Sequence, residues 1–444
     1  MALKESDANG QAASAPGPWR ARVLALSSPQ EIAAEMARLG AHRDGVAIME
    51  PKARLRLVKL DAVPLWAANI FKQEMLAAGG DAAVSQRAVL GGPGGTDCLL
   101  IGTLAQYHRL CDKLDAQPRP WSTGTPARAP QARVPGLHEA GAEIKRALSA
   151  FDSPLVVDLR CGEHSVRLGE RTLVMGIINA TLDSFSGDGL AGNLQAMVER
   201  GEQMAADGAD LLDIGGESTR PGSEPTSAAT EMAHVLPVIE DLRKRVGIPI
   251  SIDTYKAEVA RAALDAGASV VNDISGLRAD AGMAPLAAAR AVPVIVMHIR
   301  GTPRTMQENP HYADLMGEIA QYLRESVDIA AGAGVARDQV VIDPGFGFGK
   351  TAQHNLEIVR RLRELKSLGQ AVLLGPSRKS TIGQVLDLPP QERLEGTLAV
   401  LALAVANGAD LVRVHDVRAA VRAVRTADAV VRGWPGPEAA PPSP

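Results

Sequence analysis

The chain has 444 residues, more than one hydrophobic core usually holds, so we expect one large domain and a smaller one. Hydrophobic residues make up 46% and charged residues 22%, as is typical of a soluble globular enzyme. The formal net charge of -4 gives no basic field for nucleic acid. No run reaches the roughly 18 apolar residues of a membrane span. Nucleic-acid and membrane partners are therefore excluded, and small-molecule substrates are favoured.

Three cysteines are scattered along the chain, at Cys98, Cys111 and Cys161. Their number is odd, and no Cys-x-x-Cys or Cys/His spacing is present, so neither a disulfide framework nor a zinc site is predicted. The amino terminus lacks the apolar core of a secretory signal. We therefore expect a cytoplasmic, reducing environment.

Residues 1–20 are predicted to be a flexible tail, and residues 21–115 a small α/β domain. Apolar runs predict strands at residues 22–26, 46–49, 54–60 and 98–102, and helical periodicity predicts helices at residues 64–78 and 104–114. Ser28, Pro29 and Glu31 form a helix start signal, in which Ser caps, Pro takes the first turn and Glu reaches back. No motif indicates what this domain does.

Pro, Arg, Ala and Gln dominate the next segment, so residues 116–150 are predicted to be a linker followed by a lead-in helix at 139–150. Residues 155–159 and 165–168 alternate in polarity around Gly162, which predicts a β-hairpin. At the other end, residues 433–444 form a Pro-rich tail that we exclude from the fold.

Between these limits, residues 151–432 alternate strand-like runs with amphipathic helices such as 193–206, 256–266 and 315–331. The predicted strands are residues 173–178, 211–214, 248–252, 270–274, 292–297, 340–342, 371–374 and 411–414. Eight such units predict an α/β chain with a (β/α)8 TIM barrel preceded by the small α/β domain. An open doubly wound sheet is the alternative.

Polar residues follow nearly every predicted strand, and in a barrel all these strand ends open on one site. Each alone is about as often a loop or helix cap, but all of them together exceed what folding requires. The residues that would converge as a ring-binding set are Asp253, Asn272, Asp343 and Lys379. Two carboxylates, an amide and an ammonium suit a flat heterocycle with donors and acceptors on its edge. Ile274, Met297 and Phe348 would be its apolar walls, although such residues are more often plain core.

A second group of residues, Arg220, Arg413 and His415, would place positive charge near the barrel mouth and implies an anionic substrate group. Pairing of Arg413 with Asp416 is the alternative. The histidines show no metal-ligand spacing, but Mg²⁺ bridging a phosphate and a protein oxygen needs no motif. Residues 344–351 nearly spell a P-loop, yet Pro344 replaces the first glycine, so a nucleotide site is not expected.

A family resemblance rests on eight segments: NATLDSFSGDG, DIGGESTRPGSEP, SIDTYK, VNDISG, VMHIRGTPRTMQ, VIDPGFGFGK, GPSRKSTIG and RVHDV. In this order they resemble the signature segments of the dihydropteroate synthase family, over residues 154–431. The resemblance implies an enzyme of folate biosynthesis that joins 7,8-dihydropterin-6-ylmethyl diphosphate to 4-aminobenzoate and releases diphosphate. It also implies Mg²⁺, sulfonamide inhibition and a homodimer. Residues before about 120 fall outside the family's usual body.

The resemblance also implies residue roles. Its pterin-ring residues are Asp253, Asn272, Asp343 and Lys379, the same set as above. Asn179 would hold Mg²⁺ and diphosphate, with Arg220, Arg413 and His415 on the anion. The 4-aminobenzoate pocket would comprise Phe185, Thr219, Pro221, Lys379 and Ser380, and the catalytic residues would be Lys379, Arg220 and Asp183. The chain departs from the family at Leu182, where Pro is usual, and at residues 187–189.

Two other functions remain open at this stage. One is a pterin-binding methyl-folate module for a corrinoid methyltransferase, which would keep Asp253, Asn272 and Asp343 but would not need residues 377–380 or 413–415. The other is a non-catalytic paralogue that binds pterin as a scaffold for the added domain. Turnover that depends on 4-aminobenzoate separates the synthase from both.

Overall fold

The computed structural model describes residues 22–26, 28–90, 94–116, 136–153, 155–180, 194–218, 223–434 and 436. The predicted tail at 1–20 and most of the predicted linker, 117–135, lie outside this part of the chain. So does the predicted tail at 433–444, except for residues 433, 434 and 436. The chain divides into two compact units, Met1–Lys145 and Arg146–Pro444. None of the helices within the described ranges has both the length and the hydropathy needed to cross a bilayer.

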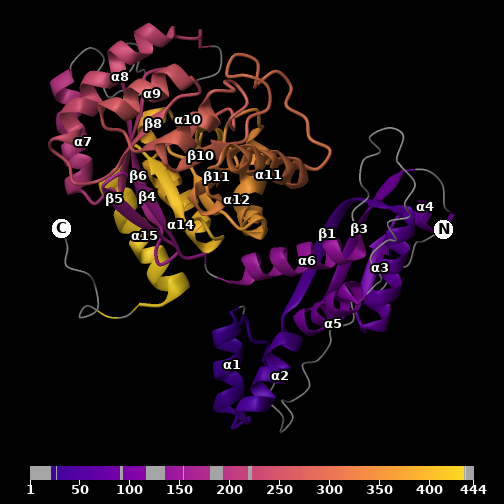
Figure 1. The fold of residues 1–444 in the computed structure, drawn as a ribbon. Coiled ribbons are helices and arrows are strands. Elements are labelled where there is room, and N and C mark those ends of the chain that lie inside the picture. Colours follow the sequence, from indigo (N-terminus) through magenta and orange to yellow (C-terminus); the bar gives the residue numbers. More distant parts are fainter. Residues whose placement is uncertain are drawn as a thin grey trace, which may run out of the picture. The chain divides into compact units, whose positions relative to one another are not determined.

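The first unit is a three-stranded antiparallel sheet with helices (Figure 1). Its elements are α1 (Pro29–Arg38), α2 (Arg43–Ala53), β1 (Leu55–Pro64), α3 (Leu65–Ala77), β2 (Asp81–Val84), α4 (Gln86–Leu90), β3 (Gly95–Thr103) and α5 (Leu104–Asp115). The strand order is β1-β3-β2. Phe71 and Met75 of α3 and Tyr107 of α5 are buried, and the Tyr107 hydroxyl donates to the Leu100 carbonyl at 2.9 Å. Long apolar side chains from two helices therefore supply the core of this unit.

The predicted start of α1 is confirmed: Ser28 and Glu31 form a reciprocal capping box, with Pro29 in the first turn. Two strand predictions were wrong. Residues 22–26 have no regular structure, and residues 46–49 lie inside α2, which begins at the His42 cap. A four-residue apolar run fits a helix as well as a strand, and a strand also needs a hydrogen-bonding neighbour that sequence alone does not reveal.

The second unit contains a closed eight-stranded parallel barrel, which confirms the predicted (β/α)8 fold and excludes the open sheet. Its strands are β6 (Leu173–Asn179), β7 (Leu211–Gly215), β8 (Ile250–Asp253), β9 (Val270–Asp273), β10 (Val294–Met297), β11 (Val340–Asp343), β12 (Ala371–Leu374) and β13 (Leu411–Val414). The helices around it are α7 (Leu194–Ala206), α8 (Ala228–Arg243), α9 (Ala257–Ala266), α10 (Met283–Arg290), α11 (Leu315–Ala333), α12 (Ala352–Arg361), α13 (Ser380–Leu386), α14 (Leu394–Ala406) and α15 (Val417–Arg432) (Figure 1).

Successive side chains along each strand point to opposite sides of the barrel wall, so they pack in two separate apolar cores. Residues such as Val174, Leu212 and Val412 face the helices, where they join the largest apolar cluster. The residues between them, such as Met175, Leu211 and Leu411, fill the barrel interior. The barrel is thus a packed core rather than a channel.

The hairpin β4 (Val157–Cys161) and β5 (His164–Leu168) closes the amino-terminal end of the barrel. Leu159, Cys161 and Leu168 of the hairpin pack in the same cluster as the interior residues. Gln339 holds it in place, since its Oε1 accepts from Arg160 N at 2.8 Å. Apolar side chains fill this end, and the polar side chains at the strand starts pair with one another, as Lys366 does with Asp410 at 2.5 Å. α6 (Leu137–Asp152) precedes the hairpin.

Candidate active site

Four polar side chains meet inside the carboxyl end of the barrel, around the Arg413 guanidinium on β13. Arg413 Nε donates to Asp213 Oδ2 at 2.5 Å, and its Nη2 donates to Asp253 Oδ2 at 2.7 Å. Asn272 Nδ2 donates to the same Asp213 oxygen at 3.0 Å. The structure therefore brings together Asp253, Asn272 and Arg413 from separate strands, and adds Asp213, to which the sequence assigned no role.

The alternative prediction, that Arg413 pairs with Asp416, was wrong. Asp416 instead accepts a hydrogen bond from Arg378 Nη2 at 2.6 Å. One guanidinium therefore serves two carboxylates. Burial raises the pKa of Asp253 to about 7, against the lowering by Arg413 and with further raising by Asp213. Asp253 accordingly changes charge close to neutral pH.

Asp343 ends β11 and lies beside Met297 in the β10–β11 register. Its Oδ1 accepts from Gly345 N at 2.7 Å. Burial raises its pKa, and Lys379 opposes that shift. Gly345 has φ +70°, and a Cβ there would lie 1.9 Å from the His298 carbonyl oxygen, so only glycine lets the chain turn beside this carboxylate.

Lys379 stands at the start of α13 and reaches towards the β11–α12 loop. Its Nζ donates to the Phe346 carbonyl and lies 4.5 Å from the centre of the Phe348 ring. Burial lowers its pKa to about 8, and Asp343 opposes this lowering. An ammonium, a carboxylate and an aromatic face thus lie along one side of the barrel mouth.

The expected apolar walls differ in exposure. Ile274 and Met297 are buried, whereas Phe348 is half-buried. Phe348 therefore presents a ring surface to the same region as the Lys379 ammonium. A planar heterocycle could form hydrogen bonds along its edge with these side chains and pack its faces on the apolar atoms. Asp253 and Asp343 would accept, Lys379 would donate, and the Asn272 amide could do either.

The near-P-loop is not a phosphate cradle, because its lysine is turned into the core. Lys350 is 3% exposed, and its Nζ shares a hydrogen bond of 2.8 Å with His298 Nδ1 and donates to the Phe348 carbonyl at 2.9 Å. Burial lowers the pKa of Lys350 well below its usual value. A buried amine of this kind fixes the loop rather than binding phosphate, in line with the expectation from Pro344.

His415 differs from the positive group that we expected. Burial lowers its pKa to about 3, so the imidazole is neutral near pH 7. Ser377 Oγ lies 3.0 Å from His415 Nδ1 and accepts from His415 N at 3.2 Å. If the serine hydroxyl donates to Nδ1, the proton of the ring stands on Nε2. His415 then offers an anion a hydrogen bond rather than a charge.

Asn179 ends β6, beside Gly215 of β7, and its side chain has no hydrogen-bond partner among the described residues. The described part of the chain holds no group of three His, Cys, Asp or Glu side chains able to hold a metal. An amide oxygen without an acidic cage fits Mg²⁺ only when the substrate's phosphate oxygens and water complete the shell. Asn179 could therefore supply one oxygen to a Mg²⁺ ion that a phosphate group carries.

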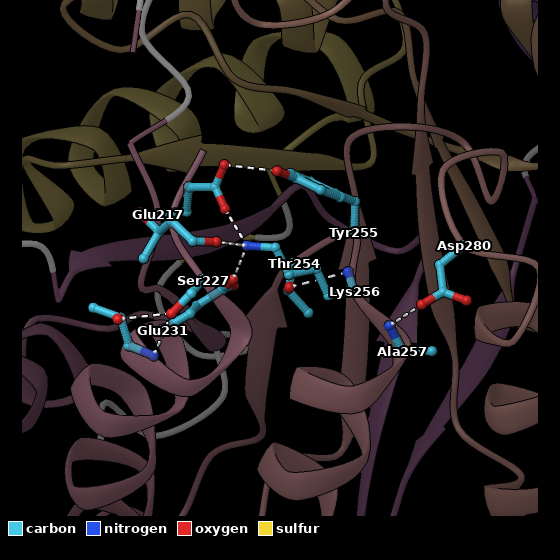
Figure 2. Close-up of polar contacts among 10 residues, drawn as sticks. Glu217, Ser227, Glu231, Thr254, Tyr255, Lys256, Ala257 and Asp280 are labelled. Carbon is cyan, nitrogen blue, oxygen red and sulfur yellow. Dashed lines mark hydrogen bonds and ion pairs between the residues drawn. The ribbon is translucent and has the colours of Figure 1, made fainter. Parts of the chain in front are cut away.

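A further polar cluster beside the mouth was missed by the sequence analysis (Figure 2). Lys256 Nζ donates to both Glu217 and Glu231, the latter at 2.6 Å, and to the Thr226 carbonyl at 2.6 Å. Tyr255 donates to Glu217 at 2.7 Å. The cluster links the end of β7, the start of α8 and the β8–α9 connection. The feature of the sequence that could have indicated this cluster is a charged residue, Lys256, in the loop that begins after Asp253.

Several residues expected in the site lie outside the described residues: Asp183, Phe185, Thr219, Arg220 and Pro221. The same holds for Leu182 and residues 187–189. Ser380 is described and exposed in the first turn of α13, next to Lys379. All four side chains of the predicted ring-binding set therefore lie at the carboxyl end of the barrel, and the predicted anion and 4-aminobenzoate sets are described only in part.

The family model described as "Pterin binding enzyme" matches residues 175–415. Because that match spans more than half of the chain, the chain belongs to the pterin binding enzymes.

Individual relatives narrow this class. The dihydropteroate synthase of Synechocystis sp. is 48% identical over 283 residues, 64% of this chain and 96% of the relative. The Xanthomonas albilineans dihydropteroate synthase solved with 4-aminobenzoic acid has a TM-score of 0.58 and 41% identity, covering 64% of this chain and 100% of that one. Within the class, the chain is a member of the dihydropteroate synthase family, as the sequence motifs indicated.

A third relative bears on the first unit. The probable bifunctional folylpolyglutamate synthase/dihydropteroate synthase of Halobacterium salinarum is 41% identical over 390 residues, 88% of this chain and 44% of the relative. That match is longer than the second unit, so it includes part of the first. Part of the first unit therefore also aligns with a relative whose name includes dihydropteroate synthase.

Proposed function

We propose that this chain condenses 7,8-dihydropterin-6-ylmethyl diphosphate with 4-aminobenzoate, giving 7,8-dihydropteroate and diphosphate. The observation that carries the proposal is the convergence of Asp253, Asn272, Asp343 and Lys379 at the barrel mouth of a chain in this family. In the reaction, the amine nitrogen forms a bond to the methylene carbon, the bond from that carbon to diphosphate breaks, and the nitrogen loses a proton.

The pterin ring is the part of the substrate that the described residues bind. Its amino group and ring N–H groups are donors, and the Asp253 and Asp343 carboxylates accept them. Lys379 donates to acceptor atoms on the other edge, and the Phe348 ring covers one face. These contacts hold the methylene carbon in one place, which turns an encounter of two substrates into a positioned reaction.

The leaving diphosphate requires hydrogen bonds and charge. His415 Nε2 would donate to it, as the Ser377 contact orients that ring. Asn179 would hold Mg²⁺, and that ion would supply Lewis-acid stabilisation of the departing anion. Arg220 and Asp183 would act beside it, and Phe185, Thr219, Pro221 and Ser380 would contact the aminobenzoate. No protein nucleophile is needed, because the aniline nitrogen is itself the nucleophile.

The test is an initial-rate assay of diphosphate release by the full chain with Mg²⁺. We expect release only when both substrates are present, and inhibition by a sulfonamide that competes with 4-aminobenzoate. Calorimetric binding of a pterin without any aminobenzoate-dependent release would contradict the synthase function and identify a non-catalytic pterin-binding protein.

We further propose a homodimer formed through the α13–α14 face of the barrel. Val385, Leu386 and Leu403 are exposed there by 60%, 42% and 56%. Exposed apolar side chains on neighbouring helices favour a partner surface. A mass of one chain in sedimentation at micromolar concentration would contradict the dimer.

A cytoplasmic location is also proposed, because Cys98, Cys111 and Cys161 are all free and buried.

A further inference from the structure

Asp213 occupies a position that the binding of a pterin ring does not by itself explain. It lies inside the barrel on β7 and is 0% exposed. One of its oxygens, Oδ2, accepts from both Arg413 Nε and Asn272 Nδ2, and the other, Oδ1, has no hydrogen-bond partner among the described residues. A half-satisfied buried carboxylate is a poor device for stabilising a fold, because burying it costs free energy that apolar packing would not.

The two groups that Asp213 holds are groups of the proposed pterin site. Arg413 on β13 donates to both Asp213 on β7 and Asp253 on the neighbouring strand β8. Asn272 donates to the same oxygen of Asp213. A substitution at Asp213 therefore affects Asp253 and Asn272 together. It does so although Asp213 lies two residues before Gly215, the last residue of β7, and so deeper in the barrel.

We propose that Asp213 is a positioning residue of the pterin site, which orients Arg413 and Asn272 and, through the shared guanidinium, sets the charge that Asp253 presents to the ring. The inference rests on the proposed pterin-binding function and deepens it. Its physical basis is that Arg413 must divide one positive charge between two carboxylates.

The charges around Asp253 determine how much proton is released when the ring binds, and this quantity can be measured. The charged groups that act on Asp253 or respond to it are Arg413, Asp213, Glu231, Asp273 and Lys379. Burial and the neighbouring carboxylates raise the pKa of Asp253 to about 7, against the effect of Arg413. A ring with N–H donors binds the ionised carboxylate, so binding below that pKa must release a proton.

The size of this release follows from simple titration. Because burial raises the pKa of Asp253 to about 7, a large fraction of the Asp253 carboxyls hold a proton at about pH 6.5. If ring binding ionises Asp253 fully, the wild-type chain releases about that fraction of a proton per ring bound. Without the Asp213 charge, Arg413 serves Asp253 alone, the pKa of Asp253 falls, and less proton is released.

The experiment is calorimetric titration of the full chain with 6-hydroxymethyl-7,8-dihydropterin at about pH 6.5, in two buffers that differ in ionisation enthalpy. Four variants are compared. Asp213→Asn removes the charge at nearly constant shape. Asp213→Glu keeps the charge but moves it. Asp213→Ala removes both. Ser251→Ala is the matched control, since Ser251 is buried in register with Asp213 and its hydroxyl lacks a partner among the described residues.

We expect Asp213→Asn to release clearly less proton than wild type, and Asp213→Glu to bind more weakly with wild-type proton release. Asp213→Ala should bind about 10- to 150-fold more weakly, as loss of a charged hydrogen bond predicts. Ser251→Ala should match wild type in both. Proton release by Asp213→Asn equal to wild type, or affinity of Asp213→Ala within twofold of wild type, would overturn the proposal.

Failure of the inference is distinguishable from failure of the proposed function. If the wild-type chain does not bind the pterin at all, the proposed function fails. If the wild-type chain binds and the Asp213 variants behave like the control, only the inference fails. Should Asp213→Asn not fold, the pair Asp213→Glu and Ser251→Ala still decides whether the carboxylate position controls affinity.

Discussion

Replacing Lys379 by Met gives the sharpest prediction for the ring-binding set. The substitution keeps the apolar stem and removes the ammonium that lies against the Phe348 ring and the Phe346 carbonyl. A lost charged hydrogen bond to the ring costs about 1.5–3 kcal/mol. This loss predicts that kcat/KM falls by about 10-fold to 150-fold.

The pH dependence adds a second, independent readout. Burial lowers the pKa of Lys379 to about 8, so the ligand-free enzyme loses its ammonium as pH rises through about 8, and pterin affinity should fall there. Arg keeps its charge at every accessible pH. We therefore expect Lys379→Arg to remove this alkaline limb, even though its turnover is lower.

The assay is the pH profile of kcat/KM for the pterin diphosphate, measured from about pH 6.5 to 9.5 with thermal melting of each variant. Lys244→Ala is the matched control, because Lys244 forms an exposed ion pair with Asp241. An alkaline limb that persists in Lys379→Arg, or a Lys379→Met variant with near-normal kcat/KM, would refute the role given to this ammonium.

Three further predictions concern other parts of the molecule. Arg413→Met should lower the free energy of unfolding by about 3–5 kcal/mol in urea titration, because it leaves Asp213 and Asp253 buried without a cation; equal stability of the variant would count against that ion pair, and added Asp213→Asn should restore part of the loss. Gly345→Ala should abolish pterin binding in calorimetry, because a Cβ there meets the His298 carbonyl at 1.9 Å; unchanged affinity would show that the loop yields. Removal of residues 1–135 should leave turnover within about threefold, since the Synechocystis relative is covered over 96% of its length by 64% of this chain; complete loss in a folded barrel would assign the first unit a catalytic role.

The barrel was predictable because its strands are buried on both faces and read as unbroken apolar runs, such as residues 173–178, each followed by an amphipathic helix. The first unit was harder. Its strand β2 (Asp81–Val84) has the sequence DAAV, which carries almost no strand propensity and is paired only because β3 lies beside it. Residues 46–49 show the converse, a β-like run held in a helix by its cap and its neighbour α1.

The convergence of Asp253, Asn272, Asp343 and Lys379 was predictable because polar residues follow nearly every strand, and the carboxyl ends of barrel strands open on one site. The charge states of these side chains were not predictable, because they depend on the burial and the neighbours of each group. The sequence suggests a cation at His415, yet burial and the nearby Arg378 and Arg413 cations lower its pKa to about 3, so the imidazole is neutral near pH 7. The partnership of Asp213, Arg413 and Asp253 joins strands that lie far apart in the sequence, and only barrel closure reveals it.

A crystal structure of the full chain with bound 6-hydroxymethyl-7,8-dihydropterin tests the central claim most directly. We predict that the ring edge lies within hydrogen-bond distance of Asp253, Asn272 and Asp343, with the Lys379 ammonium on the opposite edge and the hydroxymethyl group directed towards Asn179. A ring bound elsewhere on the barrel, or one that leaves all four of these side chains without a contact, would contradict the account.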